Sequence, residues 1–170
     1  MKHKLKVTLL LIALFFIAQI IGLLVVDKTS EKLPYGIERP EIEQRTAFLP
    51  TFIAILIMTF FIYILLKFKL YVLWKIWFFI AVIFALSLSF SSFIPETIAF
   101  ILALVLAIIK VFKPNVYVHN FTELFIYGAL AAIFFKFFDI VSISILLILI
   151  SIYDYIAVYK TKHMITLAKS

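Results

Sequence analysis

The stretch that decides the fold of this chain is IVSISILLILISIYDYIAVY, residues 140–159. This run is 20 residues long, the length that a helix needs to cross a hydrocarbon core of about 30 Å. One charged side chain, Asp154, interrupts it. An ionised Asp at the centre of a membrane helix costs roughly 2.5–3.5 kcal/mol on translocon-based scales, and such residues mark functional sites by default. Asp154 is therefore the residue to explain.

The rest of the chain is similarly apolar. Its 170 residues are 66% hydrophobic and include 20 Phe, and the mean hydropathy is +1.21. A globular core of this size cannot bury so much apolar surface, so lipid must solvate the excess. We therefore predict an all-α, polytopic membrane protein embedded in the lipid bilayer. The net charge of +7 falls in short clusters between apolar runs, which argues against a nucleic-acid partner.

Six apolar runs have the length of a membrane span, about 17 to 22 residues each. Only helices and closed barrels satisfy the backbone in lipid, and these runs are too long and continuous for barrel strands. We predict a single membrane domain, a helical bundle with six transmembrane helices. The predicted spans are residues 7–26, 47–66, 76–94, 96–112, 121–138 and 140–159, with a loop at 27–46 and a tail at 160–170.

The basic residues of the predicted loops indicate the orientation. With the amino terminus in the cytoplasm, eleven Lys and Arg residues fall on the cytoplasmic side and five on the outer side. Cytoplasmic loops carry an excess of Lys and Arg, so we predict that both termini are cytoplasmic and that the loop at 27–46 faces outward. The first apolar run ends without a cleavage site of small residues, so we interpret it as a membrane anchor and not as a secretory signal.

Asp154 lies well inside the last predicted helix. The helical rise of about 1.5 Å per residue puts it about 8 Å before the cytoplasmic end, which is deep for the short side chain of an Asp. The same helix face carries Leu147, Ser151 and Ala157, and this face is small and polar enough to abut another helix. We expect Asp154 to face protein or a water-filled cavity, and not acyl chains.

Three other acids flank the apolar runs. Asp139 begins the same helix about 22 Å from Asp154, at the opposite membrane surface, and is excluded as its partner. Glu123 comes closer to Asp154 in depth and is a candidate acid near the site. However, Asn120 and Glu123 also have the spacing of a pair that caps a helix start, and we favour this interpretation. Glu96 is interpreted in the same way for the helix at 96–112.

The residues around Asp154 resemble a known family. Tyr153-Asp154, followed by Ala157-Val158 and the tail YKTKHM at 159–164, resembles the sixth helix of the presenilin and signal-peptide-peptidase family of intramembrane aspartyl proteases, and its archaeal branch in particular. The segment NFTE at 120–123 is also similar to this branch. The resemblance implies that the chain is the amino-terminal half of a presenilin-like fold. It also implies that Asp154 is one catalytic aspartate and that Tyr153 is its neighbour.

The resemblance implies a partner as well. Family members carry a second aspartate in a Gly-x-Gly-Asp motif on helix seven and a Pro-Ala-Leu motif on helix nine. The glycines of this chain are Gly22, Gly36 and Gly128, so the first motif does not occur in its 170 residues. Aspartyl proteolysis needs two carboxylates that share a proton. We therefore expect the chain to cleave transmembrane peptide substrates only with a carboxy-terminal half that supplies the second aspartate, and without any cofactor.

Two other classes of protein remain compatible with an acid inside the membrane. A transporter or channel subunit could use Asp154 to relay a proton or to bind a cation. A noncatalytic membrane scaffold could pair it inside a helical bundle. No metal site is predicted, because the chain has no cysteine and its three histidines are scattered over loops and helix ends. Small-residue faces at Ala18 and Gly22, and at Gly128, Ala131 and Ala132, predict helix packing.

Overall fold

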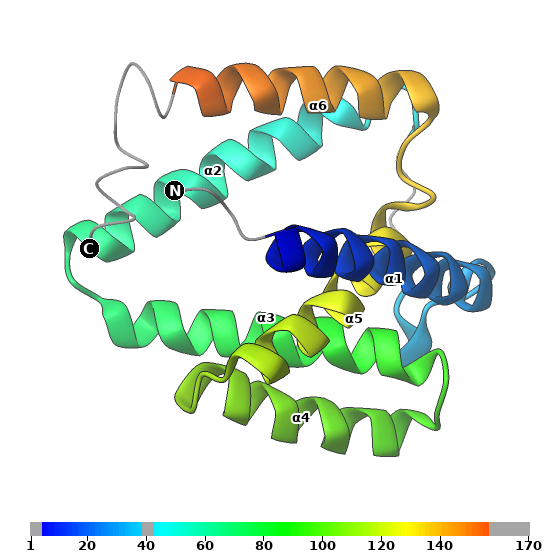
Figure 1. The fold of residues 1–170 in the computed structure, drawn as a ribbon. Coiled ribbons are helices and arrows are strands. Elements are labelled where there is room, and N and C mark those ends of the chain that lie inside the picture. Colours follow the sequence, from blue (N-terminus) through cyan, green and yellow to red (C-terminus); the bar gives the residue numbers. More distant parts are fainter. Residues whose placement is uncertain (1–4, 39–42, 157–170) are drawn as a thin grey trace. The chain divides into compact units, whose positions relative to one another are not determined.

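The protein is described by a computed structural model over residues 5–38 and 43–156. Within these residues the chain forms helices only, which confirms the all-α prediction (Figure 1). The predicted tail at 160–170, and the end of the last predicted span beyond residue 156, lie outside the described residues. The elements are α1 (Leu5–Thr29), the 3-10 turn η1 (Pro34–Gly36), α2 (Phe48–Lys67), α3 (Tyr71–Ser91), α4 (Glu96–Phe112), α5 (Val116–Phe134) and α6 (Ile140–Tyr155).

The length of the helices only partly supports six membrane spans. Within the described residues, four helices are long and apolar enough to cross a membrane, namely those at Val7–Thr29, Phe48–Leu65, Tyr71–Ser91 and Val116–Phe134. Helix α4 has 17 residues and the described part of α6 has 16. Both are therefore shorter than the shortest of these four spans, which has 18 residues. The structure therefore supports a multi-pass membrane protein, while six spans are not confirmed.

The chain divides into two compact units. The first unit contains α1, η1, most of α3, α4 and α5, and the second contains α2, the start of α3 and α6. Each unit has its own packing, and the two are described separately.

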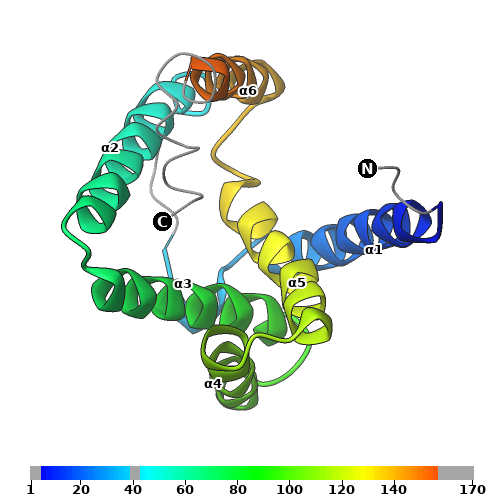
Figure 2. The same ribbon diagram turned by 60° about the vertical axis from the view of Figure 1, so that its left-hand side comes forward.

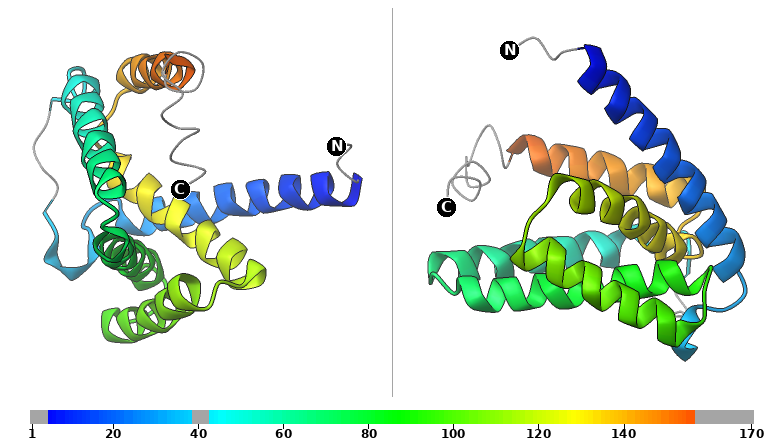
Figure 3. Two further views of the ribbon diagram at one scale, coloured as in Figure 1. Left: turned by 90° about the vertical axis from the view of Figure 1, so that its left-hand side faces the viewer. Right: turned by 60° about the horizontal axis from the view of Figure 1, so that its bottom comes forward.

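The pairing of α1 with α5 organises the first unit. A Cβ added at Gly22 would lie 4.0 Å from the Cα of Gly128, and a Cβ added at Gly128 would lie 3.3 Å from Val25. Glycine thus lets the two backbones approach closely, as small residues do between membrane helices. Ala129 and Ala132 are fully buried beside them. The predicted small-residue packing is confirmed. The two helices run in the same direction and cross, so that the first half of α1 extends beyond the crossing (Figures 2 and 3).

Helix α4 folds back along α3 in the same unit. Its buried alanines, Ala99, Ala103 and Ala107, recur every fourth residue and lie in one apolar cluster with Leu86 and Phe90 of α3. This spacing puts all three alanines on one side of the helix. The Phe90 ring extends the contact to α5.

A short loop fixes the beginning of α4. The backbone N–H of Tyr35 donates to Glu96 Oε1 at 2.8 Å, and the Tyr35 hydroxyl donates to the Glu96 carbonyl at 2.9 Å. Tyr35 and Gly36 both have positive φ, 62° and 65°, a strained conformation for the tyrosine. Burial raises the pKa of the Tyr35 phenol, and the charge of Glu96 acts in the same direction. Glu96 lies in the first turn of α4, as predicted.

In the second unit α2 and α6 lie side by side and run in the same direction (Figure 1). The start of α6 is capped by Asp139, whose carboxylate accepts from the backbone N–H of Ser142 at 2.7 Å. The buried Ser142 hydroxyl donates to the carbonyl oxygens of Gln44 and Arg45, at 2.6 and 2.8 Å. These bonds hold the segment before α2 against the first turn of α6.

Candidate active-site residues

Asp154 lies in the last turn of α6. Its side chain is exposed and has no hydrogen-bond or ion-pair partner among residues 5–38 and 43–156. Leu147 and Ser151, which share its helix face, are also exposed. Among the described residues of the second unit, no helix covers this face. The carboxylate remains available to a group that comes from elsewhere.

Tyr153 occupies a different position on the same helix. It is partly buried and lines a cavity of about 260 Å³ together with Leu56, Thr59, Phe60 and Tyr63 of α2. Adjacent residues of a helix point about 100° apart, because one turn takes 3.6 residues. Tyr153 therefore packs α6 toward α2, while Asp154 projects from a neighbouring face.

Glu123 has surroundings of another kind, in the first unit. Its Oε1 atom lies 2.7 Å from the ammonium group of Lys110 on α4, and the Lys110 side chain is only 2% exposed. The same ammonium group donates to Thr122 Oγ1 at 3.0 Å and lies 3.1 Å from His119 Nδ1. The Lys110 ammonium group thus has three polar neighbours, as many as it has N–H donors. These four residues, Lys110, His119, Thr122 and Glu123, are called the lysine cluster below.

The prediction that Asn120 and Glu123 cap the start of the fifth helix is wrong. Helix α5 begins at Val116, and its cap is Asn115, whose side-chain oxygen accepts from the backbone N–H of Tyr117 at 2.8 Å. Asn120 and Glu123 lie inside the helix, one and two turns later. The helix starts earlier than predicted because the Asn115 cap fixes its start five residues before Phe121.

The burial of Lys110 was not predicted, because Lys110 is one of the eleven Lys and Arg residues assigned to the cytoplasmic side. A sequence signal was present, because Lys110 continues the face of Ala99, Ala103 and Ala107 on α4. A lysine on a small-residue face that packs against another helix requires an acid as its partner. Glu123, thirteen residues later, supplies it. His119, one of the three scattered histidines, belongs to the lysine cluster, with its side chain 59% exposed.

A metal centre is not formed within the described parts of the chain. Among residues 5–38 and 43–156, no group of three or more His, Asp or Glu side chains could hold a metal ion. The two candidate acids therefore act as single carboxylates. Glu123 is paired with Lys110, and Asp154 has no partner among the described residues.

Apolar helices of membrane-spanning length, with an acid near the end of α6, define an integral, multi-pass membrane protein. The sequence profile described as "Signal-peptide peptidase, presenilin aspartyl protease" matches residues 12–170. The chain therefore belongs to the signal-peptide-peptidase and presenilin family of aspartyl proteases. No curated protein and no solved structure shows a significant match to it. The family predicted from the residues around Asp154 is thus confirmed.

Proposed function

We propose that this chain supplies Asp154 as one of the two catalytic aspartates of an intramembrane protease that hydrolyses peptide bonds of transmembrane substrates. Tyr153 is its neighbour on α6 and holds that helix against α2. The second aspartate comes from a partner segment that carries a Gly-x-Gly-Asp motif, and no cofactor takes part. The observation that carries the proposal is an Asp in the last turn of an apolar helix, without a partner among residues 5–38 and 43–156, in a member of an aspartyl protease family.

The exposed position of Asp154 supports a shared site. Two carboxylates that share one proton must lie close together, since their mutual repulsion keeps one of them protonated. An Asp that was already paired with a lysine of its own chain would be held as a carboxylate and could not share a proton. Asp154 has no such partner in the described chain, and its helix face is uncovered.

The reaction requires different roles of the two acids. The ionised aspartate takes a proton from a water molecule, whose oxygen attacks the substrate carbonyl carbon, while the protonated aspartate donates to the carbonyl oxygen. This addition gives a gem-diol without a covalent bond to the enzyme. When the C–N bond breaks, the leaving nitrogen takes up a proton, and the products are a carboxyl and an amine. Asp154 fills one of these roles.

The proposed orientation has both termini in the cytoplasm. It rests on the excess of Lys and Arg in the loops assigned to that side, eleven against five. The directions of the helices agree with alternating spans, because α1 and α5 run the same way within one unit and α2 and α6 run the same way within the other. In this orientation Asp154 lies toward the cytoplasmic end of α6.

Glu123 is proposed to hold Lys110 and not to share a proton with Asp154. Its Oε1 atom lies 2.7 Å from the buried ammonium group of Lys110, so this oxygen is already engaged within the first unit. Glu123→Gln keeps one acceptor oxygen for Lys110. We therefore expect that variant to retain cleavage per molecule of folded protein, measured beside the wild-type chain. Complete loss of cleavage in folded Glu123→Gln protein would contradict this assignment.

The proposed function is tested by replacing Asp154. The chain is co-reconstituted in liposomes with a segment of the same family that contains Gly-x-Gly-Asp, and cleavage of a labelled transmembrane peptide is followed. We expect Asp154→Ala to abolish cleavage while membrane insertion and helix content stay unchanged. Asp139→Asn is the matched control, because it changes the other Asp of α6 and keeps a capping side chain.

Two results would contradict the proposal. Normal cleavage by the Asp154→Ala protein would remove Asp154 from the catalytic pair. Proton or cation flux that depends on Asp154, in wild-type liposomes that yield no peptide product with the partner segment, would assign the chain to transport instead.

A further inference from the structure

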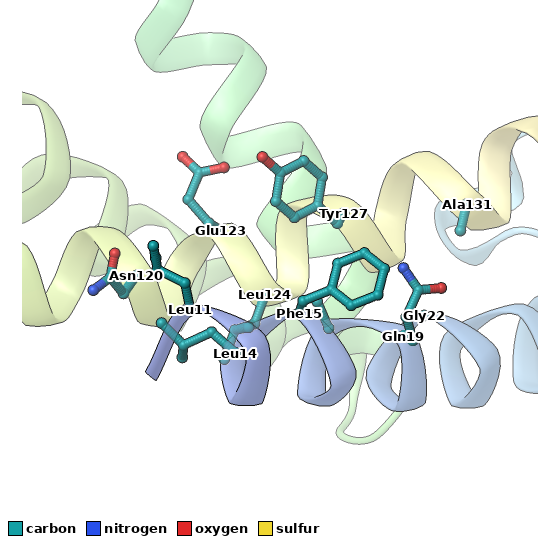
Figure 4. Close-up of a pocket in the computed structure, with 11 residues that line it drawn as sticks. Leu11, Leu14, Phe15, Gln19, Gly22, Asn120, Glu123, Leu124, Tyr127 and Ala131 are labelled. Carbon is teal, nitrogen blue, oxygen red and sulfur yellow. The ribbon is translucent and has the colours of Figure 1, made fainter. Parts of the chain in front are cut away.

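The two units join their helices by different contacts. In the first unit, α1 packs against α5 through small residues, and Glu123 lines the groove that remains between the two helices (Figure 4). In the second unit, a hydroxyl group joins the first turn of α6 to the segment before α2. Ser142 Oγ lies 2.6 Å from the carbonyl oxygen of Gln44 and 2.8 Å from that of Arg45. A polar contact therefore fixes the start of the helix that ends with Asp154.

Ser142 is fully buried and is held from two sides. Its backbone N–H donates to the Asp139 carboxylate at 2.7 Å, while its hydroxyl group donates to the segment before α2. That segment is bonded a second time, because Gln44 Nε2 donates to the Lys136 carbonyl at 3.0 Å. All of these residues belong to the second unit. They are called the α6 clasp below, and its members are Gln44, Arg45, Lys136, Asp139 and Ser142.

The packing of α6 against α2 becomes looser with distance from the α6 clasp. Leu146 and Tyr153 lie within about 40° of Ser142 around the helix, so all three share one side of it. Leu146, one turn after Ser142, is 7% exposed. Tyr153 is only partly buried and lines the cavity of about 260 Å³ beside α2. The contact between the two helices is thus closest at the clasp and leaves space next to Asp154.

Apolar packing alone does not fix the depth of a helix in the membrane. Attraction between apolar groups is not directional, and lipid tails are as apolar as the side chains of a neighbouring helix. A hydrogen bond is restricted in distance and angle, so it fixes its donor relative to its acceptor. Ser142 and Asp154 are twelve residues apart in one continuous helix, which is about 18 Å along its axis. A shift or rotation at the α6 clasp is therefore carried to Asp154.

We propose that Ser142 is a positioning residue for Asp154. By bonding the carbonyl groups before α2, it fixes the depth and rotation of α6 and so the place where Asp154 meets the second aspartate. An error of about 1 Å in the placement of a reacting group can cost about 100-fold in rate. The inference rests on the proposed catalytic role of Asp154. In the proposed orientation Gln44 and Arg45 belong to the outer loop, so this loop sets the depth of an acid near the cytoplasmic surface.

The absence of cysteine from the sequence allows the position of α6 to be measured directly. Spin labels are attached at Ile57→Cys on α2 and Ile152→Cys on α6, two exposed positions of the second unit that do not line the cavity. Pulsed electron paramagnetic resonance gives the distribution of distances between the labels in phosphatidylcholine vesicles, without substrate or partner. We expect Ser142→Ala to widen this distribution and to displace its maximum.

Ser144→Ala is the matched control. It removes a hydroxyl group of the same helix that donates to the Ile140 carbonyl in its own turn, at 2.7 Å. We expect its distance distribution to equal that of the unsubstituted sequence with the same labels. Gln44→Ala is a second variant, outside α6, that removes the bond to Lys136. It should widen the distribution as Ser142→Ala does, and it replaces that variant if Ser142→Ala lowers the helix content seen by circular dichroism.

Cleavage provides the second readout. The chain without labels is reconstituted with the segment that contains Gly-x-Gly-Asp, and the rate is measured per molecule of folded protein. We expect Ser142→Ala to lower kcat by about 10- to 100-fold and to change KM by less than about twofold, because a misplaced acid slows the reaction without weakening substrate binding. Ser144→Ala should keep the kcat of the wild type. General destabilisation would not separate kcat from KM in this way.

Three outcomes would overturn the inference. An unchanged distance distribution in Ser142→Ala and Gln44→Ala would show that the α6 clasp does not position α6. An equal change in Ser144→Ala would show that the effect is not particular to Ser142. A displaced α6 with the kcat of the wild type would show that this position does not matter for the reaction. Absence of product from the wild-type chain would instead contradict the proposed function, and the distances, which need no cleavage, would still decide whether Ser142 positions α6.

Discussion

Glu123 in the first unit and Asp154 in the second are both acids on apolar helices, but their surroundings differ in kind. Glu123 is held by the buried ammonium group of Lys110, at 2.7 Å. Asp154 is exposed and unpaired among the described residues. The ion pair of Glu123 with Lys110 links two helices of the first unit. Asp154 forms no such link among the described residues. Their different surroundings separate a structural acid from a candidate catalytic one.

Removing Lys110 should have the largest effect on stability. Lys110→Met leaves the Glu123 carboxylate without its counter-ion, and we expect the free energy of unfolding to fall by about 3 kcal/mol, near the lower end for breaking a buried pair because Glu123 is partly exposed. Asp154→Asn should change it by less than about 0.5 kcal/mol. Denaturant titration in detergent micelles, followed by circular dichroism, measures both.

A double variant sharpens the same contrast. Lys110→Met combined with Glu123→Leu removes both charges, so the uncompensated carboxylate disappears and much of the lost stability should return. If Asp154→Asn destabilised the protein as much as Lys110→Met does, Asp154 would be a structural acid like Glu123, and the distinction between them would be lost.

The next largest effect concerns the close contact of α1 and α5. Gly128→Ala places a methyl group 3.3 Å from the Val25 side chain and 3.4 Å from the Ser89 side chain, so these neighbours must move by a few tenths of an ångström. We expect a loss of about 1–3 kcal/mol, the usual cost of overpacking. Gly22→Ala is the control, since its nearest neighbour would be 3.9 Å away. Equal melting temperatures for the two variants would show that Gly128 is not the tight point of this contact.

A smaller effect is expected for the hydroxyl group of the lysine cluster. Thr122→Val removes an acceptor from Lys110, and we expect a loss of about 1 kcal/mol, the typical worth of one hydrogen bond. Thr59→Val is matched to it, because the Thr59 hydroxyl bonds only the carbonyl of Ile55 in its own helix. We expect a lower melting temperature for Thr122→Val than for Thr59→Val. A larger loss of stability for Thr59→Val would contradict a stabilising role of the Thr122 hydroxyl in the lysine cluster.

The smallest effect is a dependence on pH at the start of α6. The hydrogen bond from the backbone N–H of Ser142 holds the pKa of Asp139 below its ordinary value of 3.8. A lowered pKa in the folded protein means that Asp139 stabilises the protein above about pH 4 and that this contribution is lost as the pH falls through the lowered pKa. Asp139→Asn keeps the cap without the charge. Its melting temperature should therefore vary less between pH 5 and pH 2.5 than that of the wild type.

Local patterns predicted most of the helices but not their partners. The apolar runs located α1, α2 and α4 to within a few residues. The beginning of α5 was misplaced because His119 and Asn120 interrupt the apolar pattern, and the cap of the helix is a single side chain, Asn115. The role of Glu123 was misread for the same reason, since a capping interpretation assumes that the helix begins at Asn120.

The sequence by itself determined that this chain is an all-α membrane protein and that α1 and α5 carry small-residue faces. These properties depend on composition and on spacing along one helix, which the sequence shows directly. The family was indicated by the resemblance of the residues around Asp154 and is shown by the profile that matches residues 12–170. Only the tertiary structure decided that Lys110 is buried against Glu123 and that Gly22 of α1 meets Gly128 of α5. Contacts between helices depend on how each is rotated about its axis and on where it crosses its neighbour, and packing of the whole unit sets both.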